Sequence, residues 1–188
     1  VSGHSYNKGY VDEEPSRRGE TVAADAAAGA SAAFAAFTAL WNRRKTGKGQ
    51  LIELPLAENF IPFMSESIAD FNMNKRVRST IGNRDRRMAP HGVYPCIGED
   101  KWMTIAVSNN TQWQSLCTII GLPNLATDIR FKNPDSRLKN HDELDEIVSQ
   151  WTKTQNHLEA FHQLQKAGIP AGPVLDELEA LEDPHLVH

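Results

Sequence analysis

Asp25 is the residue whose type and surroundings are best suited to covalent chemistry. It stands at the start of a long alanine-rich stretch, among the small residues Ala24, Ala26, Ala27, Ala28, Gly29 and Ala30. At the start of a helix, the free N–H groups and the positive end of the dipole favour an ionised carboxylate. Such a carboxylate can attack an activated acyl group as a nucleophile. The position equally suits an ordinary helix N-cap, so Asp25 taken alone leaves both roles open.

The turn Gly47-Lys48-Gly49 does not fit a phosphate-binding loop. That motif needs Ser or Thr after the lysine and a helix that begins behind it. Here glycine follows the lysine, and the turn comes after the end of the predicted alanine-rich helix. The dipole at that end of a helix repels anions, so we interpret these residues as a turn only.

The histidines do not form a metal-binding pattern. His157 and His162 are five positions apart, and a second pair near the C-terminal end is three apart. Neither spacing matches the HExxH motif, and no carboxylate is placed to complete a ligand set. We therefore expect solvated surface histidines and no bound metal.

Composition indicates a globular protein from a reducing compartment. The 188 residues are 40% hydrophobic and 23% charged, with a net charge of −4, which does not favour nucleic acid or an anionic membrane. The only two cysteines, Cys96 and Cys117, do not make a disulfide framework. Residues 22–41 are mostly alanine and include Asp25, so we do not expect them to span a membrane. We expect a cytoplasmic protein with no nucleic-acid or membrane partner.

Residues 1–72 are predicted to contain a helix, a strand and a second helix. Alanine is the strongest helix former and predicts a helix from about 24 to 45. Its apolar edge is formed by Phe34, Phe37, Leu40 and Trp41. A buried strand is expected over 50–54 and a helix over about 56–71. This series is typical of an α/β layer.

Residues 73–90 are predicted to be a basic linker. Six cations stand against one carboxylate in this stretch, without apolar periodicity. No aromatic side chains interleave the cations, so stacking on nucleic-acid bases is not expected. We interpret the stretch as a solvated connector that could meet phosphate groups of a ligand.

Residues 91–188 are predicted to form a small α+β domain. Strands are expected over 92–96 and 101–107, and helices over about 113–120, 140–151 and 156–167. Asn140 and Glu143 have the spacing of a capping box for the middle helix. The predicted fold class is α/β, with part of a large domain joined by the linker to this small domain.

Both ends of the sequence read as interior sequence. The chain begins Val1-Ser2-Gly3 without a methionine, and Asp183-Pro184 near its other end has the pattern of a helix start. We therefore expect a piece of a longer protein, with the small domain truncated before its return to the large one.

Several ordered motifs resemble the class III (CaiB/BaiF) CoA-transferase family, which includes formyl-CoA transferase and carnitine CoA-transferase relatives. The first is the Asp-x-x-x-Gly opening at Asp25, and the second is the turn from Arg44 to Gln50, with Ile52, Glu53 and Glu58 behind it. Further matches follow in order along the chain: Gly82-Asn83, residues 89–94, residues 168–174, and Asp183-Pro184-His185. Together these motifs span nearly the whole sequence.

The resemblance implies transfer of coenzyme A from an acyl-CoA thioester to a free carboxylic acid. Asp25 would form a mixed anhydride and then an aspartyl-CoA thioester, with acyl-CoA and a small acid as substrates and no bound cofactor. The family's large domain is Rossmann-like, lies mainly before this sequence and supplies most contacts to CoA. CoA-binding residues therefore cannot be assigned here. The full-length parent is expected to be an interlocked homodimer.

One stretch departs from the family pattern. In the formyl-CoA transferase branch a glycine-rich loop covers the active site, whereas residues 84–91 here are stiffer and cationic. This difference indicates another substrate, one that carries a carboxylate. His91 is a candidate substrate-binding residue, with a turn histidine of no function as the alternative.

Two alternatives to the transferase remain open. The first is an α-methylacyl-CoA racemase of the same family, in which Asp25 would exchange protons beside an upstream histidine; His4 is upstream but closer than expected. The second is a folded fragment that is inert, or only an interaction module, because it lacks the CoA-binding half. CoA binding by the isolated chain would exclude this second alternative.

Overall fold

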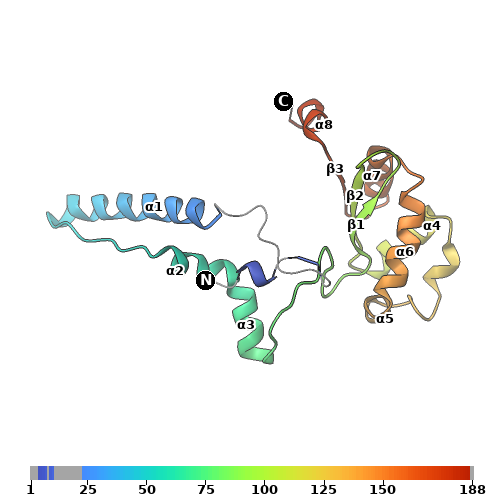
Figure 1. Ribbon diagram of the computed structural model, residues 1–188, viewed down its shortest axis with the longest axis horizontal. Helices are drawn as coiled ribbons and strands as arrows, with labels where there is room; N and C mark the ends of the chain where they lie inside the picture. The colour runs from blue at the N-terminus through green and yellow to red at the C-terminus, as the bar shows by residue number, and fades with distance from the viewer. Residues whose placement is uncertain (1–3, 8, 11–22, 187–188) are drawn as a thin grey trace. The chain divides into compact units, whose positions relative to one another are not determined.

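The computed structural model describes residues 4–7, 9, 10 and 23–186, in two compact units that divide between Gly82 and Asn83. This division lies within the stretch predicted as a linker, residues 73–90. The described chain is mixed α/β, mostly helical, with one small antiparallel sheet. Each unit is described below by itself (Figure 1).

The first unit begins with a short 3-10 helix, η1 (His4–Asn7), and a long α-helix, α1 (Ala23–Thr46). The prediction of a helix over about 24–45 is confirmed. Three basic residues in its last turn complement the dipole, and Gly47 ends it at a φ of +72°. There the N–H of Gly47 donates to the carbonyl of Arg43 at 2.8 Å.

The predicted strand over 50–54 is wrong. Residues 47–55 run between α1 and α2 (Leu56–Phe60) without strand pairing, and every residue of 50–54 is exposed. A strand is stabilised by a hydrogen-bonded neighbour, and the described residues of the first unit supply none. The apolar side chains of this segment, Leu51, Ile52 and Leu54, therefore lack a layer that would bury them.

The helix predicted over about 56–71 is interrupted and ends later. After α2 the chain forms a 3-10 turn, η2 (Ile61–Met64), and then α3 (Ser65–Asn74). Pro62 lacks the N–H that a continuous helix needs, which accounts for the interruption. Lys75, with a left-handed φ of 55°, ends α3.

The first unit buries little of its apolar surface. Among its described residues only Ala28, Phe60 and Asp70 are buried. The predicted apolar edge of α1 is exposed, from 54% at Leu40 to 76% at Phe34. In the described chain, α1 is also the helix whose length and composition would suffice to cross a membrane. A core helix of a soluble protein meets the same criteria, so the expected absence of a membrane partner stays a prediction.

The second unit is built on a three-stranded antiparallel sheet in the order β1 (His91–Pro95), β2 (Trp102–Ala106), β3 (Ala171–Val174). The two predicted strands are confirmed within a residue or two, and β3 was not expected. In the register, His91 faces Ala106 and Trp102 faces Val174. Proline and glycine dominate the sequence of β3, and both are poor predictors of a strand.

Helices surround this sheet (Figure 1). Their bounds are α4 (Asn110–Ile119), η3 (Pro123–Ala126), α5 (Pro134–Lys139), α6 (His141–Thr152), α7 (His157–Lys166) and α8 (Glu177–Glu182). Helix α6 packs against β1, and α7 packs against β2 and β3. The three predicted helices correspond to α4, α6 and α7, whereas α5 and α8 were not expected.

The core of the second unit is built from apolar side chains of its sheet and of α4, α6 and α7. Trp113, Leu116 and Cys117 of α4 and Leu144 and Val148 of α6 are each no more than 1% exposed. They form one cluster with Met103 and Ile105 of β2 and Leu164 of α7. Burial raises the pKa of the Cys117 thiol to about 12 and that of Cys96 in the same direction.

The predicted capping box at the start of α6 is wrong. The side chain of Asn140 makes no capping bond; its amide donates to the carbonyls of Arg130 and Ser136 at 3.0 and 2.8 Å. The Glu143 carboxylate is paired with Arg130. Both side chains of the predicted box are therefore committed to the segment that precedes α6.

Candidate functional site

Asp25 lies in the first turn of α1, and its side chain is exposed. Among the described residues its carboxylate has no hydrogen-bond or ion-pair partner. The buried Ala28 follows three residues later, and a Cβ built on Gly29 would meet no atom within 4 Å. The structure thus places an unpaired carboxylate at the positive end of a 24-residue helix, bordered by small side chains.

His4, the histidine of the racemase alternative, belongs to η1 of the same unit. Its ring meets that of Phe60 edge to face, with centroids 4.9 Å apart. This packing against a buried phenylalanine is an ordinary structural role for a half-buried imidazole. The described contacts of His4 therefore add no support to proton exchange with Asp25.

His91 belongs to the second unit, at the head of β1. Its Nδ1 lies 2.7 Å from the backbone oxygen of Asn83. A carbonyl oxygen can only accept, so Nδ1 carries the proton, and in the neutral ring Nε2 keeps a free lone pair. Nε2 makes no hydrogen bond to any residue that the structure describes. A half-buried ring with one nitrogen fixed and the other open can contact a ligand.

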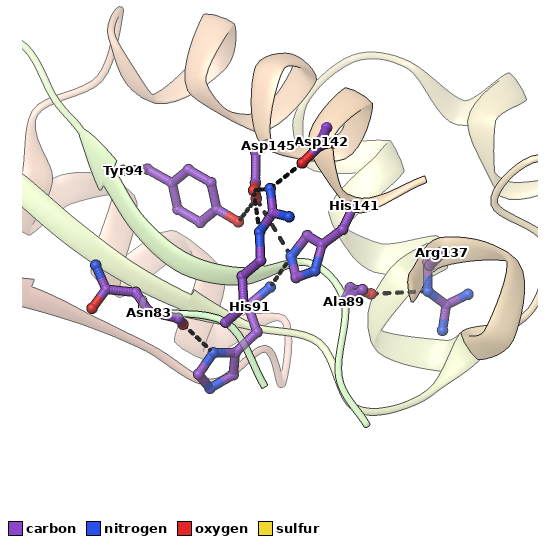
Figure 2. Close-up of polar contacts among 9 residues, drawn as sticks. Asn83, Ala89, His91, Tyr94, Arg137, His141, Asp142 and Asp145 are labelled. Atoms are coloured by element: carbon purple, nitrogen blue, oxygen red, sulfur yellow. Dashed lines mark hydrogen bonds and ion pairs between the residues drawn. The ribbon is translucent and has the colours of Figure 1, made fainter. Parts of the chain in front are cut away.

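A group of polar side chains connects the chain before β1 with α6 (Figure 2). Asp145 is its centre: one carboxylate oxygen accepts from the Tyr94 hydroxyl at 2.7 Å, and the other from Arg84 at 2.6 and 3.1 Å. Arg84 also donates to Asp142 at 2.6 Å. We call these four residues, together with His141, the Asp145 cluster.

The contacts within the Asp145 cluster keep Tyr94 protonated and Arg84 charged. Burial and the neighbouring Asp145 carboxylate raise the pKa of Tyr94 far above its usual value, so the hydroxyl stays a donor. For Arg84, partial burial opposes the charge, but the bonds to Asp142 and Asp145 outweigh it and raise the pKa. The result is a persistent ion pair between the linker stretch and α6.

Arg137 of α5 fixes the same stretch from a second side. Its side chain is fully buried, and its guanidinium donates to the carbonyl of Ala89 at 3.0 Å (Figure 2). It also donates to the carbonyl of Phe131 and to the side chain of Asn110, each at 3.0 Å. The guanidinium also lies over the Trp113 ring, 5.6 Å from its centroid. Desolvation lowers the pKa of this group, because no carboxylate of the described residues neutralises it.

Sequence reasoning missed both of these arrangements. It treated residues 73–90 as a solvated connector, which is wrong for Arg84 and for Arg78, whose side chain pairs with Glu66 and Asp70 of α3. It also expected surface histidines, whereas His141 and His157 are only 5% and 3% exposed. The partners are 50 to 61 residues apart for the Asp145 cluster, so no local pattern announces them.

The described residues contain no group of three or more His, Cys, Asp or Glu side chains arranged to hold a metal ion. Among the residues that the structure describes, the candidate functional residues from the sequence are Asp25 in the first unit and His91 in the second. Both lie in motifs that carried the resemblance to a known family.

Comparison with known proteins supports that resemblance along the whole chain. The family model "CoA-transferase family III" matches residues 1–188. The chain is 30% identical over 179 residues to succinyl-CoA–D-citramalate CoA-transferase of Chloroflexus aurantiacus, and 32% identical over 184 residues to acetyl-CoA:oxalate CoA-transferase of Acetobacter aceti. These alignments cover 95% and 98% of this chain but 44% and 47% of the relatives.

A solved structure agrees with the sequence matches. The crystal structure of a CaiB/BaiF family protein from Brucella suis superposes with a TM-score of 0.88 at 27% identity, over 99% of this chain and 48% of that one. The chain thus spans somewhat less than half the length of the relatives that it matches. Because the family model covers every residue, the chain belongs to CoA-transferase family III, the CaiB/BaiF family.

Proposed function

We propose that the longer protein to which this sequence corresponds transfers coenzyme A from an acyl-CoA thioester to a carboxylic acid, with Asp25 as nucleophile. The observation that carries the proposal is the unpaired, exposed carboxylate of Asp25 in the first turn of α1, within the family motif. A carboxylate engaged in an ion pair would have to lose its partner before attacking a carbonyl carbon. Among the described residues Asp25 has none to lose.

The first half of the reaction converts the donor acyl-CoA into an aspartyl-CoA thioester in two steps. An oxygen of Asp25 attacks the thioester carbon, the C–S bond breaks, and CoA leaves as a thiolate, so that donor acid and Asp25 are joined in a mixed anhydride. The thiolate then attacks the Asp25 carbonyl of this anhydride. The C–O bond breaks, the donor acid leaves as a carboxylate, and an aspartyl-CoA thioester remains.

The acceptor acid reverses these steps with its own carboxylate. Its oxygen attacks the aspartyl thioester and expels the thiolate, which then attacks the acceptor's carbonyl carbon. The new acyl-CoA departs and the Asp25 carboxylate is regenerated. One thioester is lost and one is formed, with no net transfer of protons or electrons, so the sequence needs neither ATP nor a redox partner.

Asp25 is suited to these steps by its place on the helix. The dipole of α1 and its free N–H groups favour the ionised form that attacks, and they also stabilise negative charge that develops on the aspartyl carbonyl oxygen. The small side chains that follow leave the approach to the carboxylate open. The N-terminal unit would be the end of a Rossmann-like large domain whose remainder supplies the CoA site, in a cytoplasmic homodimer.

We propose short dicarboxylic acids as the substrate class. The relatives from Chloroflexus and Acetobacter are transferases for D-citramalate, with succinyl-CoA, and for oxalate, with acetyl-CoA. Residues 84–91 of this chain include Arg87, whose side chain is 85% exposed and 3.9 Å from the Asp85 carboxylate, and His91 with its open Nε2. Cationic and hydrogen-bonding groups of this kind suit the second carboxylate of such an acid.

The test is trapping and substitution in the full-length protein. Incubation with acyl-CoA should give a hydroxylamine-labile adduct of CoA mass on the peptide that contains Asp25. Asp25→Asn, which keeps the shape but not the nucleophile, should lower transfer by on the order of 10³-fold or more. Asp135→Asn is a matched control, because Asp135 is also an exposed first-turn residue, of α5.

Three results would contradict the assignment. Retained transfer in Asp25→Asn would remove Asp25 as the nucleophile. Deuterium exchange at the α-carbon of acyl-CoA in D₂O, without any adduct, would indicate a racemase instead. No reaction of either kind would indicate an interaction protein.

A further inference from the structure

The head of β1 is attached to α6 through the imidazole of His141. The Nε2 atom of this buried ring accepts the backbone N–H of His91 at 3.2 Å (Figure 2). A ring nitrogen that accepts a hydrogen bond cannot carry a proton, so this contact requires neutral His141. The same Nε2 lies 3.5 Å from a carboxylate oxygen of Asp145, which is close enough for an ion pair.

We propose that His141 is a proton-operated switch that holds the backbone of His91 when neutral and releases it to pair with Asp145 when protonated. One atom serves both arrangements. With a proton, Nε2 becomes a donor that faces the donor N–H of His91 on one side and the acceptor Asp145 on the other. The contact between Nε2 and the N–H of His91 then becomes repulsive, because both groups are donors. The contact between Nε2 and the Asp145 carboxylate becomes a charge-assisted hydrogen bond.

Release of the His91 backbone would also affect residues 83–90, because this stretch is attached through the same groups. The His91 ring donates to the carbonyl of Asn83, and the next residue, Arg84, shares Asp145 with His141. A protonated His141 would face Oδ1 of this carboxylate, which already accepts from the Tyr94 hydroxyl, while Arg84 is bound to Oδ2. One proton thus breaks the backbone attachment of His91 and adds a positive charge beside the carboxylate that holds Arg84.

The surroundings of His141 set the pH range of the switch. The charged and titratable groups that face its ring are Asp142 and Asp145 on α6, Arg84 on the preceding stretch, and His91 and Tyr94 on β1. Burial is the largest influence and lowers the pKa of His141; Asp145 raises it, and Arg84 and His91 lower it further. The holding form therefore dominates at neutral pH, and release occurs below the ordinary histidine pKa of about 6.5.

This switch goes beyond the proposed function and does not depend on it. Its geometry lies entirely within the second unit, and its readout is structural. If the protein does not transfer CoA, the proposal for His141 is unaffected. If the His141 proposal is wrong, the proposed role of Asp25 is unaffected.

The experiment is a pH titration of the 188-residue chain by NMR, from about pH 8 to pH 5. The imidazole of His141 and the backbone amide of His91 are followed together. We expect the amide resonance of His91 to move with the midpoint of the His141 ring, below about 6.5. The hydrogen-exchange protection factor of this amide should fall about fivefold to tenfold across the same range, the net worth of one hydrogen bond.

Three variants test whether protonation of His141 is what changes the amide of His91. His141→Gln supplies a non-titrating acceptor at the position of Nε2, so the amide of His91 should become insensitive to pH. His162→Gln, an exposed histidine of α7, is the matched control and should behave as wild type. In His91→Gln the amide at position 91 remains, without an imidazole on the same residue, and should still follow His141.

The proposal is overturned if the amide of His91 does not move while His141 titrates, or if it follows only the ring of His91. It is equally overturned if His141 stays neutral over the whole range, or if His141→Gln titrates like wild type. Should His141→Gln fail to fold, the comparison of the two midpoints in wild type and in His91→Gln decides the question.

Discussion

Arg137 illustrates how a single buried residue can organise the chain around a candidate site. Its guanidinium donates to two backbone carbonyls and one side-chain amide oxygen, from three segments that precede it in sequence. One of those carbonyls belongs to Ala89, two residues before His91. The charge is retained because it is hydrogen-bonded and lies over the Trp113 ring, rather than because a carboxylate neutralises it.

We expect Arg137→Met to destabilise the chain by about 2–4 kcal/mol, because two buried backbone carbonyls and the side chain of Asn110 would lose their donor. Urea unfolding measures this loss. Arg87→Met is the control, since that side chain is 85% exposed and should change the free energy of unfolding by less than about 0.5 kcal/mol. Equal effects of the two substitutions would show that Arg137 has no special structural role.

Helix α1 carries the proposed nucleophile, and Ala28 is its one buried residue among those described. Its central and C-terminal aromatic residues, Phe34, Phe37 and Trp41, are more than 60% exposed. Its stability in this chain must therefore come mainly from alanine and from its charged ends. Gly29 opposes that stability, and no described atom comes close enough to require a glycine there.

At the scale of this element, Gly29→Ala should stabilise the isolated chain by about 0.5–1 kcal/mol and raise its helix content. Circular dichroism during thermal unfolding measures both changes. Gly121→Ala is the matched comparison and should destabilise the chain. An added Cβ at Gly121 also meets no atom, but Gly121 follows α4 with a φ of +77°, a conformation that is strained for alanine. Destabilisation by Gly29→Ala would reveal a close neighbour that requires glycine at this position.

At the scale of the whole molecule, the two units differ in how complete they are. The second has a continuous core that joins its sheet to α4, α6 and α7, whereas the first buries three described residues. The chain also corresponds to 44% to 48% of the relatives' length. The CoA site that we propose for the longer protein would accordingly draw on polypeptide outside these 188 residues.

We therefore expect the isolated 188-residue chain to bind CoA weakly, with a Kd above roughly 100 μM. Isothermal titration calorimetry measures the affinity, and a full-length family member is the positive control. Micromolar binding by the isolated chain would show that these residues hold a CoA site of their own. It would also exclude the alternative of an inert fragment.

The sequence by itself determined the local features of this protein. Alanine content fixed α1, hydrophobic periodicity fixed α4, α6 and the core positions of the second unit, and ordered motifs gave the family and the proposed role of Asp25. These signals are readable because each depends on residues within one or two helical turns, or on short motifs.

Only the tertiary structure decided the rest. It left residues 50–54 unpaired, added β3 as a partner of β2, and brought Arg84, His91 and Tyr94 to residues of α6 that are 50 to 61 positions away. It also buried His141, which changed an expected surface histidine into a hydrogen-bond acceptor. Strand pairing and buried polar contacts join distant segments, and their stability depends on partners that no local pattern specifies.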